Sequence, residues 1–147
     1  MRFDRIENLL YEYALRIDSG DLAGVAELFR DGRVETGQGD GIGYDGVLKM
    51  YSATVRLYED GTPRTLHQLS NLQIEQDGDE AECHSCFCVL QALPDFPLQA
   101  IITGRYRDRL RRVDGQWQFV SKRITPLHIG DMSRHVLFDA GTLQQAD

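Results

Sequence analysis

Residues 6–29, with the sequence IENLLYEYALRIDSGDLAGVAELF, determine how the rest of the chain is arranged. The apolar positions of the first half are Ile6, Leu9, Leu10, Tyr13 and Ile17. Because they recur every three or four residues, they predict an amphipathic helix over about residues 3–18. The Ser-Gly-Asp sequence at residues 19–21 ends this helix, since Gly terminates a helix and either Ser or Asp can cap the next one. A second helix is therefore expected over about residues 21–29.

Asp18 lies at the C-terminal end of the first predicted helix, on the edge of its apolar stripe. A carboxylate at this end faces the negative pole of the helix dipole, which is unfavourable. We therefore expect Asp18 either to be exposed to solvent or to have a polar partner elsewhere in the chain.

Beyond this helix pair the periodicity changes from helical to strand-like. A short strand is expected at residues 33–36, a glycine-rich loop at 37–46, and a third helix from Val47 to about Tyr58, capped by Asp45. Four long strands follow, at residues 65–75, 80–93, 98–112 and 116–125. Asp-Gly sequences between them are typical of hairpin turns. Helices followed by an antiparallel meander predict an α+β fold, with the helices on one face of a strongly curved sheet.

The composition indicates one compact domain. The chain has 147 residues, and a hydrophobic content of 41% excludes a disordered protein. Its net charge of −7 argues against nucleic acid as a partner, and no apolar run is long enough to cross a membrane. The N-terminus lacks the features of a signal peptide, and three cysteines do not suit a secreted disulfide framework. We expect a soluble, cytoplasmic protein with a domain at residues 1–130 and a C-terminal tail at 131–147.

Two polar side chains of the third long strand are expected to point toward the helices. Arginines alternate along this strand at positions 105, 107, 109 and 111, and they define its solvated face. Tyr106 and Asp108 then lie on the covered, concave face, where an Asp must be paired or hydrogen-bonded. A structural hydrogen bond to a tyrosine or to the backbone is the favoured explanation for Asp108, and a pocket role is the alternative.

His67 is the candidate partner of Asp18. It shares one face of the first long strand with Leu69 and Asn71. A histidine among apolar neighbours is more often a hydrogen-bonded core residue than a catalyst. However, a carboxylate at the end of a helix that lies across a curved sheet could bind His67, fix its tautomer and orient it as a general base.

Metal and nucleotide sites are not expected. On a strand Cys83 faces away from Cys86 and Cys88, and no second CxxC pair exists, so the thiols and His84 do not suggest a zinc site. Small buried thiols are the simpler explanation. The glycine-rich loop at residues 37–46 lacks the strand-to-helix context of a nucleotide-binding fingerprint. We therefore expect neither a metal nor a cofactor.

Several short segments together resemble a known family. They are residues 13–22 (YALRIDSGDL), 28–32 (LFRDG), 67–71 (HQLSN), 104–108 (GRYRD), 114–119 (DGQWQF) and Arg123. In this order and spacing they resemble the SnoaL-like branch of the NTF2-like superfamily over about residues 3–125. The resemblance implies a cone-shaped α+β domain whose helices and curved sheet enclose a pocket, assembled into homodimers or larger homo-oligomers.

Within that branch the chain resembles dehydratase-like enzymes, namely scytalone dehydratase, bile-acid 7α-dehydratase and hexachlorocyclohexane dehydrochlorinase. These enzymes pair an Asp near the end of the first helix with a His on the first long strand, and Asp18 and His67 stand at the matching positions. The resemblance also implies that Tyr13 binds substrate and that Arg123 lies in the pocket. The second pocket histidine of scytalone dehydratase has no counterpart, because Leu90 stands near its position.

These features predict a cofactor-independent lyase or isomerase, dehydratase-like or cyclase-like, that acts on a small, largely apolar, oxygenated ring compound. His67 would remove an acidic C–H proton, while Asp18 would orient the ring and stabilise the imidazolium. Tyr13, with Asn71 or Arg123, would bind the oxygen that gains negative charge. The predicted substrate-binding residues are Tyr13, Asn71, Tyr51, Tyr106, Asp108 and Arg123.

Two other classes of protein fit the same sequence. One is a small-molecule binding module of the same fold, in which the Asp-His pair is retained without turnover. The other is a structural protein similar to the small subunit of aromatic-ring dioxygenases, which share the fold and the Tyr/Asp pattern of the first helix.

Overall fold

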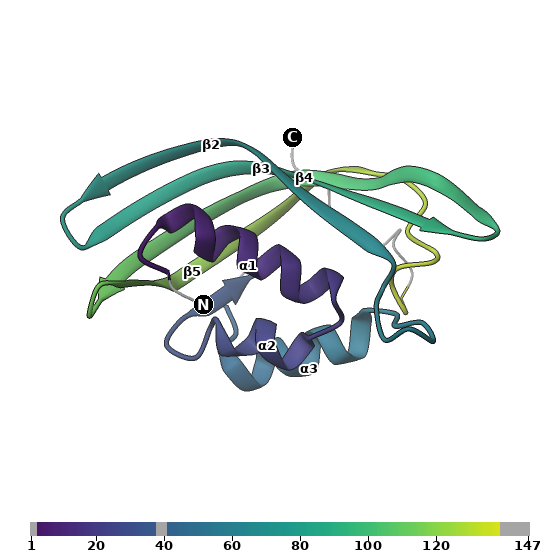
Figure 1. Cartoon of the computed structure of the whole chain (residues 1–147), viewed down its shortest axis with the longest axis horizontal. Helices are drawn as coiled ribbons and strands as arrows, with labels where there is room; N and C mark the ends of the chain where they lie inside the picture. Colours follow the sequence, from purple (N-terminus) through teal and green to yellow (C-terminus); the bar gives the residue numbers. More distant parts are fainter. Residues whose placement is uncertain (1–2, 38–40, 139–147) are drawn as a thin grey trace.

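The computed structural model describes residues 3–37 and 41–138, and Figure 1 shows them as a long curved sheet with the helices beneath its concave side. The helices are α1 (Ile6–Asp18), α2 (Leu22–Glu27) and α3 (Tyr44–Thr54). The strands are β1 (Arg33–Glu35), β2 (Thr65–Asp77), β3 (Glu80–Leu93), β4 (Phe96–Val113) and β5 (Gln116–Ile129). Their order in the sheet is β1-β5-β4-β3-β2.

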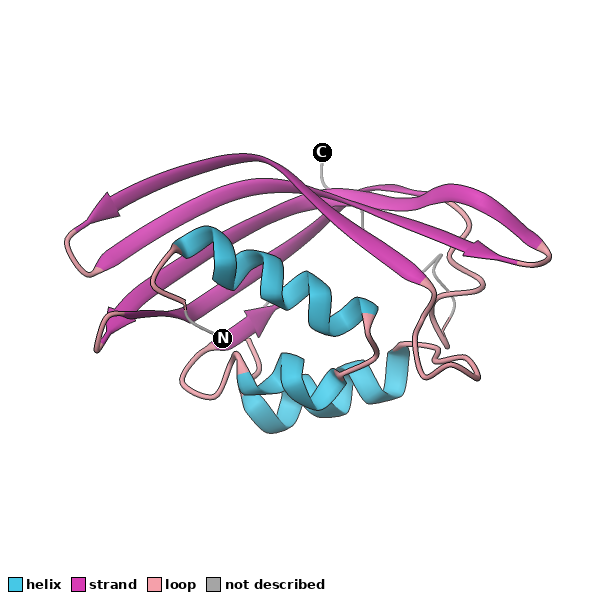
Figure 2. Ribbon diagram, viewed as in Figure 1, coloured by secondary structure: helices cyan, strands magenta, loops and turns pink. Residues whose placement is uncertain are grey.

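The sheet is mostly antiparallel. Consecutive strands from β2 to β5 pair antiparallel, and among the described residues only the short β1 pairs parallel, against β5. Figure 2 shows that all helices lie on the same side of this sheet. The predicted α+β fold, with helices on one face of a curved sheet, is therefore confirmed.

The helix pair forms for the reasons that the sequence suggests. The apolar stripe of α1 is buried from Ile6 to Ile17 and packs into the main core. Gly20 then takes a left-handed conformation (φ 78°), and a side chain there would collide with the carbonyl oxygen of Gly61. Asp21 caps α2 by accepting a hydrogen bond from the backbone N–H of Gly24 at 2.9 Å.

The third helix differs from its prediction at both ends. Gly43, not Asp45, is the N-cap residue, and Asp45 lies in the first turn, where a carboxylate favours the positive end of the helix dipole. The helix ends at Thr54 because Val55 is extended and forms a bridge with Val136. Pairing with a segment distant in sequence thus overrides the helical periodicity that continues to Tyr58.

The strands alternate as predicted along β4. The arginines at positions 105, 107, 109 and 111 are exposed, whereas Tyr106, Asp108 and Leu110 are buried under the helices. The Asp-Gly turn after β4 has positive φ angles at Asp114 (52°) and Gly115 (76°), which this type of hairpin requires.

A β-bulge interrupts the alternation of β2. The pairing register with β3 shifts between Ser70 and Gln73, and Asn71 within this bulge has a φ of 55°. Asn71 is exposed as a result. The prediction that Asn71 shares the inner face with His67 is therefore wrong, because a bulge inserts an extra residue and reverses the faces.

The described part of the predicted C-terminal tail, residues 131–138, packs against the helices and the sheet. Met132 and Val136 belong to the main hydrophobic core. The remainder of the predicted tail, residues 139–147, lies outside the described residues. Among the helices of the described residues, none is long and apolar enough to span a membrane.

Candidate active site

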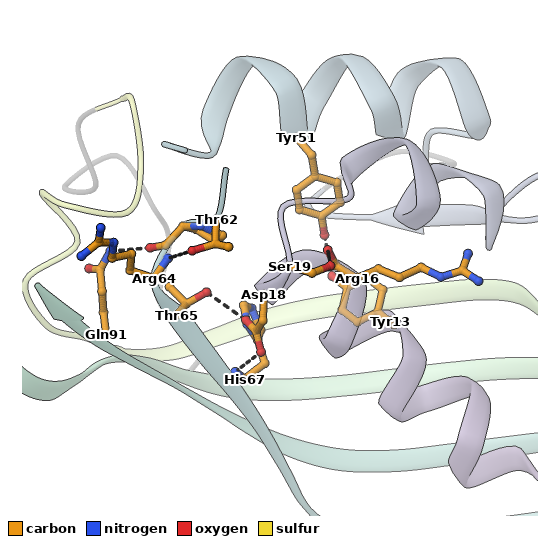
Figure 3. A network of polar contacts seen from close by, with 11 residues as sticks. Tyr13, Arg16, Asp18, Ser19, Tyr51, Thr62, Arg64, Thr65, His67 and Gln91 are labelled. Atoms are coloured by element: carbon orange, nitrogen blue, oxygen red, sulfur yellow. Dashed lines mark hydrogen bonds and ion pairs between the residues drawn. The ribbon is translucent and has the colours of Figure 1, made fainter. Parts of the chain in front are cut away.

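Asp18 binds the first long strand through three hydrogen bonds (Figure 3). Its Oδ1 lies 2.6 Å from His67 Nδ1 and accepts a second bond from the hydroxyl of Thr65 at 2.8 Å. Its Oδ2 accepts the backbone N–H of His67, also at 2.8 Å. These hydrogen bonds offset the unfavourable interaction between the carboxylate and the negative end of the α1 dipole. The predicted contact between Asp18 and His67 is present.

This geometry determines which nitrogen of His67 is free. A carboxylate can only accept a hydrogen bond, so the proton lies on Nδ1, and Nε2 of the neutral ring carries a lone pair. The side chains of His67 and Asp18 are only 8% and 13% exposed, so the contact is largely shielded from water. Nε2 of His67 is therefore the nitrogen that can accept a proton.

His67 lines a cavity of about 880 Å³ between the helices, the sheet and the C-terminal segment. Most of its wall is apolar and includes Ile17, Met50, Val89, Ile102, Met132 and Phe138. Polar side chains are fewer and include Tyr13, Tyr51, His67, Arg123 and His135. A mainly apolar wall with a few polar groups suits a small organic molecule.

Tyr13 and Tyr51 form a hydrogen-bonded pair in the cavity wall, with their hydroxyl oxygens 2.5 Å apart. Burial raises the pKa of Tyr13 well above its usual value and raises the pKa of Tyr51 to about 12. Both hydroxyls therefore keep their protons at neutral pH. One donates to the other, and the accepting hydroxyl retains an O–H that can bind a ligand oxygen.

Tyr106 also lines the cavity, but its ring is held within an aromatic cluster. It stacks on Phe87 with ring centroids 4.4 Å apart and meets the edge of Tyr13 at 5.9 Å. The ammonium group of Lys122 lies 3.5 Å from the centroid of the Tyr106 ring. This cation–π contact supports the cavity wall from behind.

Asp108 is paired with Lys122 behind this wall and is not among the residues that line the cavity. The Lys122 ammonium donates to Asp108 at 3.1 Å, and both side chains are fully buried. Burial raises the pKa of Asp108 and lowers the pKa of Lys122, and each charge opposes the shift of the other. The expected partner of Asp108, a tyrosine or the backbone, is therefore replaced by a lysine, and its predicted place in the pocket is wrong.

The two remaining predicted residues lie at the edge of the site or outside it. Arg123 borders the cavity, but its side chain is 51% exposed and pairs with Glu35 at 3.0 Å, so it belongs to the rim. Asn71 is exposed in the β2 bulge and is absent from the cavity wall. The structure thus brings together Tyr13, Tyr51, Tyr106 and His67 with Asp18, and it places Asn71 elsewhere.

Two residues near the cavity, Lys122 and His135, are not predicted by the sequence patterns. The register of β5 against β4 shifts between Phe119 and Ser121, and this bulge turns Lys122 toward the helices. His135 lies in a segment without helical or strand periodicity, so no sequence pattern marks it as a cavity residue. Both positions depend on contacts between distant parts of the chain.

The cysteines do not form a ligand set. Cys83 is buried while Cys86 and Cys88 are half-buried, and burial raises the pKa of Cys83 to about 11. Within residues 3–37 and 41–138, no three His, Cys, Asp or Glu side chains gather in a way that could hold a metal ion. The candidate site is thus defined by the tyrosines, the histidines and Asp18.

Comparison with known proteins identifies the family. Residues 3–123 match the SnoaL-like domain, and the chain belongs to this family. Its fold is the NTF2-like fold. No curated protein sequence matches the chain.

Solved structures of other proteins share this fold. A variant of Rv3472, a protein of unknown function from Mycobacterium tuberculosis, is 28% identical, with a TM-score of 0.68 and coverage of 86% of this chain and 72% of that one. A candidate scytalone dehydratase from Novosphingobium aromaticivorans is 25% identical, with a TM-score of 0.67 and coverage of 86% and 84%. LinA is 20% identical, with a TM-score of 0.64 and coverage of 85% of each chain, which shows a shared fold.

Proposed function

We propose that this protein is a cofactor-independent lyase or isomerase that removes a proton from a small, largely apolar ring compound. The main observation that supports the proposal is the contact between Asp18 and His67, which lines a mainly apolar cavity. The similarity to a candidate scytalone dehydratase supports the same class of reaction.

In this proposal His67 is the general base. Its Nε2 takes a proton from a carbon atom next to a carbonyl or next to a leaving group, and the ring becomes an imidazolium. Asp18, already bound to Nδ1, stabilises the positive charge and keeps the ring in place. A base positioned in this way contributes roughly 10²–10⁴ to the rate.

The Tyr13–Tyr51 pair is the proposed binding site for the oxygen that gains negative charge. The pair retains one O–H beyond its internal hydrogen bond, and burial keeps both hydroxyls protonated. A donor of this kind stabilises an enolate oxygen without surrendering its proton. In this proposal Tyr51 takes the place of Asn71 beside Tyr13, which already belonged to the predicted oxygen-binding groups.

Proton abstraction can be tested without the natural substrate. The protein is incubated in D₂O with 2-indanone, a bicyclic ketone with acidic C–H bonds, and the loss of its α-proton signal is followed by NMR. We expect catalysed exchange in the wild type and a rate lower by about 10²–10⁴ in His67→Ala. His84→Ala is the matched control, since His84 is an exposed histidine outside the cavity wall. Equal catalysis by the wild type and His67→Ala would contradict the proposal.

A second function is favoured by one specific observation. Two of the hydrogen bonds of Asp18 come from Thr65 and from the backbone of His67, and they join α1 to β2 whether or not chemistry occurs. The protein could thus be a binding module whose Asp-His pair shapes the cavity. Binding of 2-indanone without any exchange above the buffer rate, across a panel of related ring ketones, would favour this function.

A further inference from the structure

His135 enters the cavity from the C-terminal segment, far in sequence from His67. Backbone hydrogen bonds hold the segment in place, because the N–H of Arg56 donates to the carbonyl of His135 at 2.8 Å. The N–H of Leu137 donates to the carbonyl of Thr54 at 2.9 Å. The position of His135 therefore does not depend on its own side chain.

The rings of His135 and His67 face the same space. Both residues line the cavity, and their ring centroids lie 6.4 Å apart at an interplanar angle of 69°. Within the described part of the chain, no hydrogen bond joins the two rings. A ligand that approaches His67 would therefore come within reach of His135 as well.

The two ring nitrogens of His135 have different surroundings. Nδ1 is enclosed and has no hydrogen-bond partner among the described residues, whereas Nε2 is not enclosed in this way. A proton on Nδ1 would be a buried, unsatisfied donor, and such groups are rare. The favoured neutral tautomer therefore carries its proton on Nε2. Burial, with a smaller effect of nearby His67, lowers the pKa of His135 to about 4, so the ring is neutral at neutral pH.

We propose that His135 is a substrate-binding residue that donates a hydrogen bond from Nε2 to a second oxygen atom of the bound ring compound. This inference rests on the proposed function, in which the Tyr13–Tyr51 pair binds the first oxygen. The substrate class is thereby narrowed to ring compounds with two oxygen substituents, one carbonyl and one hydroxyl or ether. A neutral donor suits this role, because a second imidazolium beside His67 would oppose the positive charge that His67 acquires.

The experiment measures binding of four probes that differ only in their oxygen atoms. The probes are indane, 2-indanone, 4-hydroxy-2-indanone and 5-hydroxy-2-indanone, and their dissociation constants are measured by calorimetry. In the wild type we expect the hydroxyl of one of the two positional isomers to strengthen binding by roughly 3–10-fold over 2-indanone. In His135→Phe this gain disappears, so that both hydroxylated probes bind no more tightly than 2-indanone binds to the same variant. His135→Gln keeps part of the gain, since its amide can donate a hydrogen bond.

Two measurements separate this inference from a purely structural role. Nitrogen-15 NMR of the histidine rings should show His135 protonated on Nε2 at pH 7, with a shift of this nitrogen when the hydroxylated probe binds. His128→Phe is the control, because His128 binds Thr103 at an exposed position away from the cavity wall. An unchanged hydroxyl gain in His135→Phe, or a proton on Nδ1, would overturn the inference.

The binding readouts do not require turnover. If the wild type catalyses no exchange but the hydroxyl gain still depends on His135, the proposed reaction fails and the binding role of His135 stands. If exchange depends on His67 while the hydroxyl gain is independent of His135, the reaction stands and the inference fails.

Discussion

Asp18 and Asp108 each pair with a basic side chain, and of these two pairs only that of Asp18 reaches the cavity. Asp18 binds His67, and His67 forms part of the cavity wall. Asp108 binds Lys122 behind that wall, where both side chains are completely enclosed. The difference shows that a buried acid–base pair is not itself evidence for catalysis, since the basic group must also face a space that a substrate can enter.

The two pairs also differ in the capacity of the base. His67 has a second ring nitrogen beyond the one that binds Asp18, so it can exchange a proton with a ligand. The single nitrogen of Lys122 is occupied by Asp108 and by the faces of Tyr106 and Tyr13, at 3.5 and 4.4 Å from their ring centroids. We therefore assign a structural role to Lys122 and Asp108, which hold the tyrosine wall in place.

The largest expected effect is on stability, in the enclosed pair. Asp108→Ala leaves Lys122 buried without a counter-charge, and we expect the free energy of unfolding to fall by about 3–5 kcal/mol. Urea denaturation followed by circular dichroism measures this change. The double variant Asp108→Leu/Lys122→Met is the control, because replacing both charges by apolar groups of similar size is often close to neutral. If Asp108→Ala were as stable as the wild type, this result would contradict the structural role of Asp108 and Lys122.

The second prediction concerns how His135 affects the stability of the protein at low pH. The folded state holds the pKa of His135 at about 4, below the usual 6.5, so the unfolded state binds more protons between these values. The stability associated with neutral His135 is therefore complete above pH 6.5 and is lost as the pH falls toward 4, by about 3 kcal/mol. Unfolding curves of the wild type and of His135→Gln, measured between pH 7 and 4, isolate the contribution of His135 to the free energy of unfolding. If the free energy of unfolding depends on pH in the same way in both proteins, His135 does not cause the loss of stability in acid.

The third prediction concerns the anchoring of α1 to β2. Asp18→Asn replaces charged hydrogen bonds to Thr65 and His67 by weaker neutral ones, and its amide NH₂ cannot accept. We expect a loss of about 1–3 kcal/mol in the free energy of unfolding. Thr65→Val, which removes one hydroxyl and leaves the contact with His67, is the matched control and should cost less. Thermal denaturation distinguishes the two, and equal stability of Asp18→Asn and the wild type would argue against the anchoring role.

The smallest expected effect is at the tyrosine pair. Tyr51→Phe removes one hydroxyl and leaves Tyr13 with its own O–H. We expect deuterium exchange of 2-indanone to slow by roughly tenfold, which corresponds to the loss of one neutral hydrogen bond in the transition state. Tyr11→Phe, at an exposed position of α1, should have no effect. Unchanged exchange in Tyr51→Phe would remove the pair from the proposed mechanism.

Much of the fold follows from local patterns. The stripe of α1, the Gly20 break and the turn at Asp114 and Gly115 depend on neighbouring residues alone, and these elements form where they are predicted. The first predicted Asp-Gly turn is displaced by one residue, because Asp77 still pairs with Glu80 and the loop consists of Gly78 and Asp79. The contact between Asp18 and His67 could also be predicted, because a carboxylate at the wrong end of a helix requires a partner.

The other residues could not be placed because their positions depend on interruptions of those patterns. A bulge in β2 turns Asn71 outward, and a register shift in β5 turns Lys122 inward. Each bulge is formed by pairing between strands, and strict alternation along one strand cannot reveal it. The position of His135 could be predicted only if the path of an aperiodic segment back to the cavity were known.

The most direct measurement compares one variant from each of the two pairs in the same assay. Deuterium exchange of 2-indanone is measured for His67→Ala and for the apolar double variant Asp108→Leu/Lys122→Met, with folding verified for both. We expect His67→Ala to lose exchange by about 10²–10⁴, while the double variant stays within a few-fold of the wild type. Exchange that survives in His67→Ala, or that is lost equally in both folded variants, would contradict it.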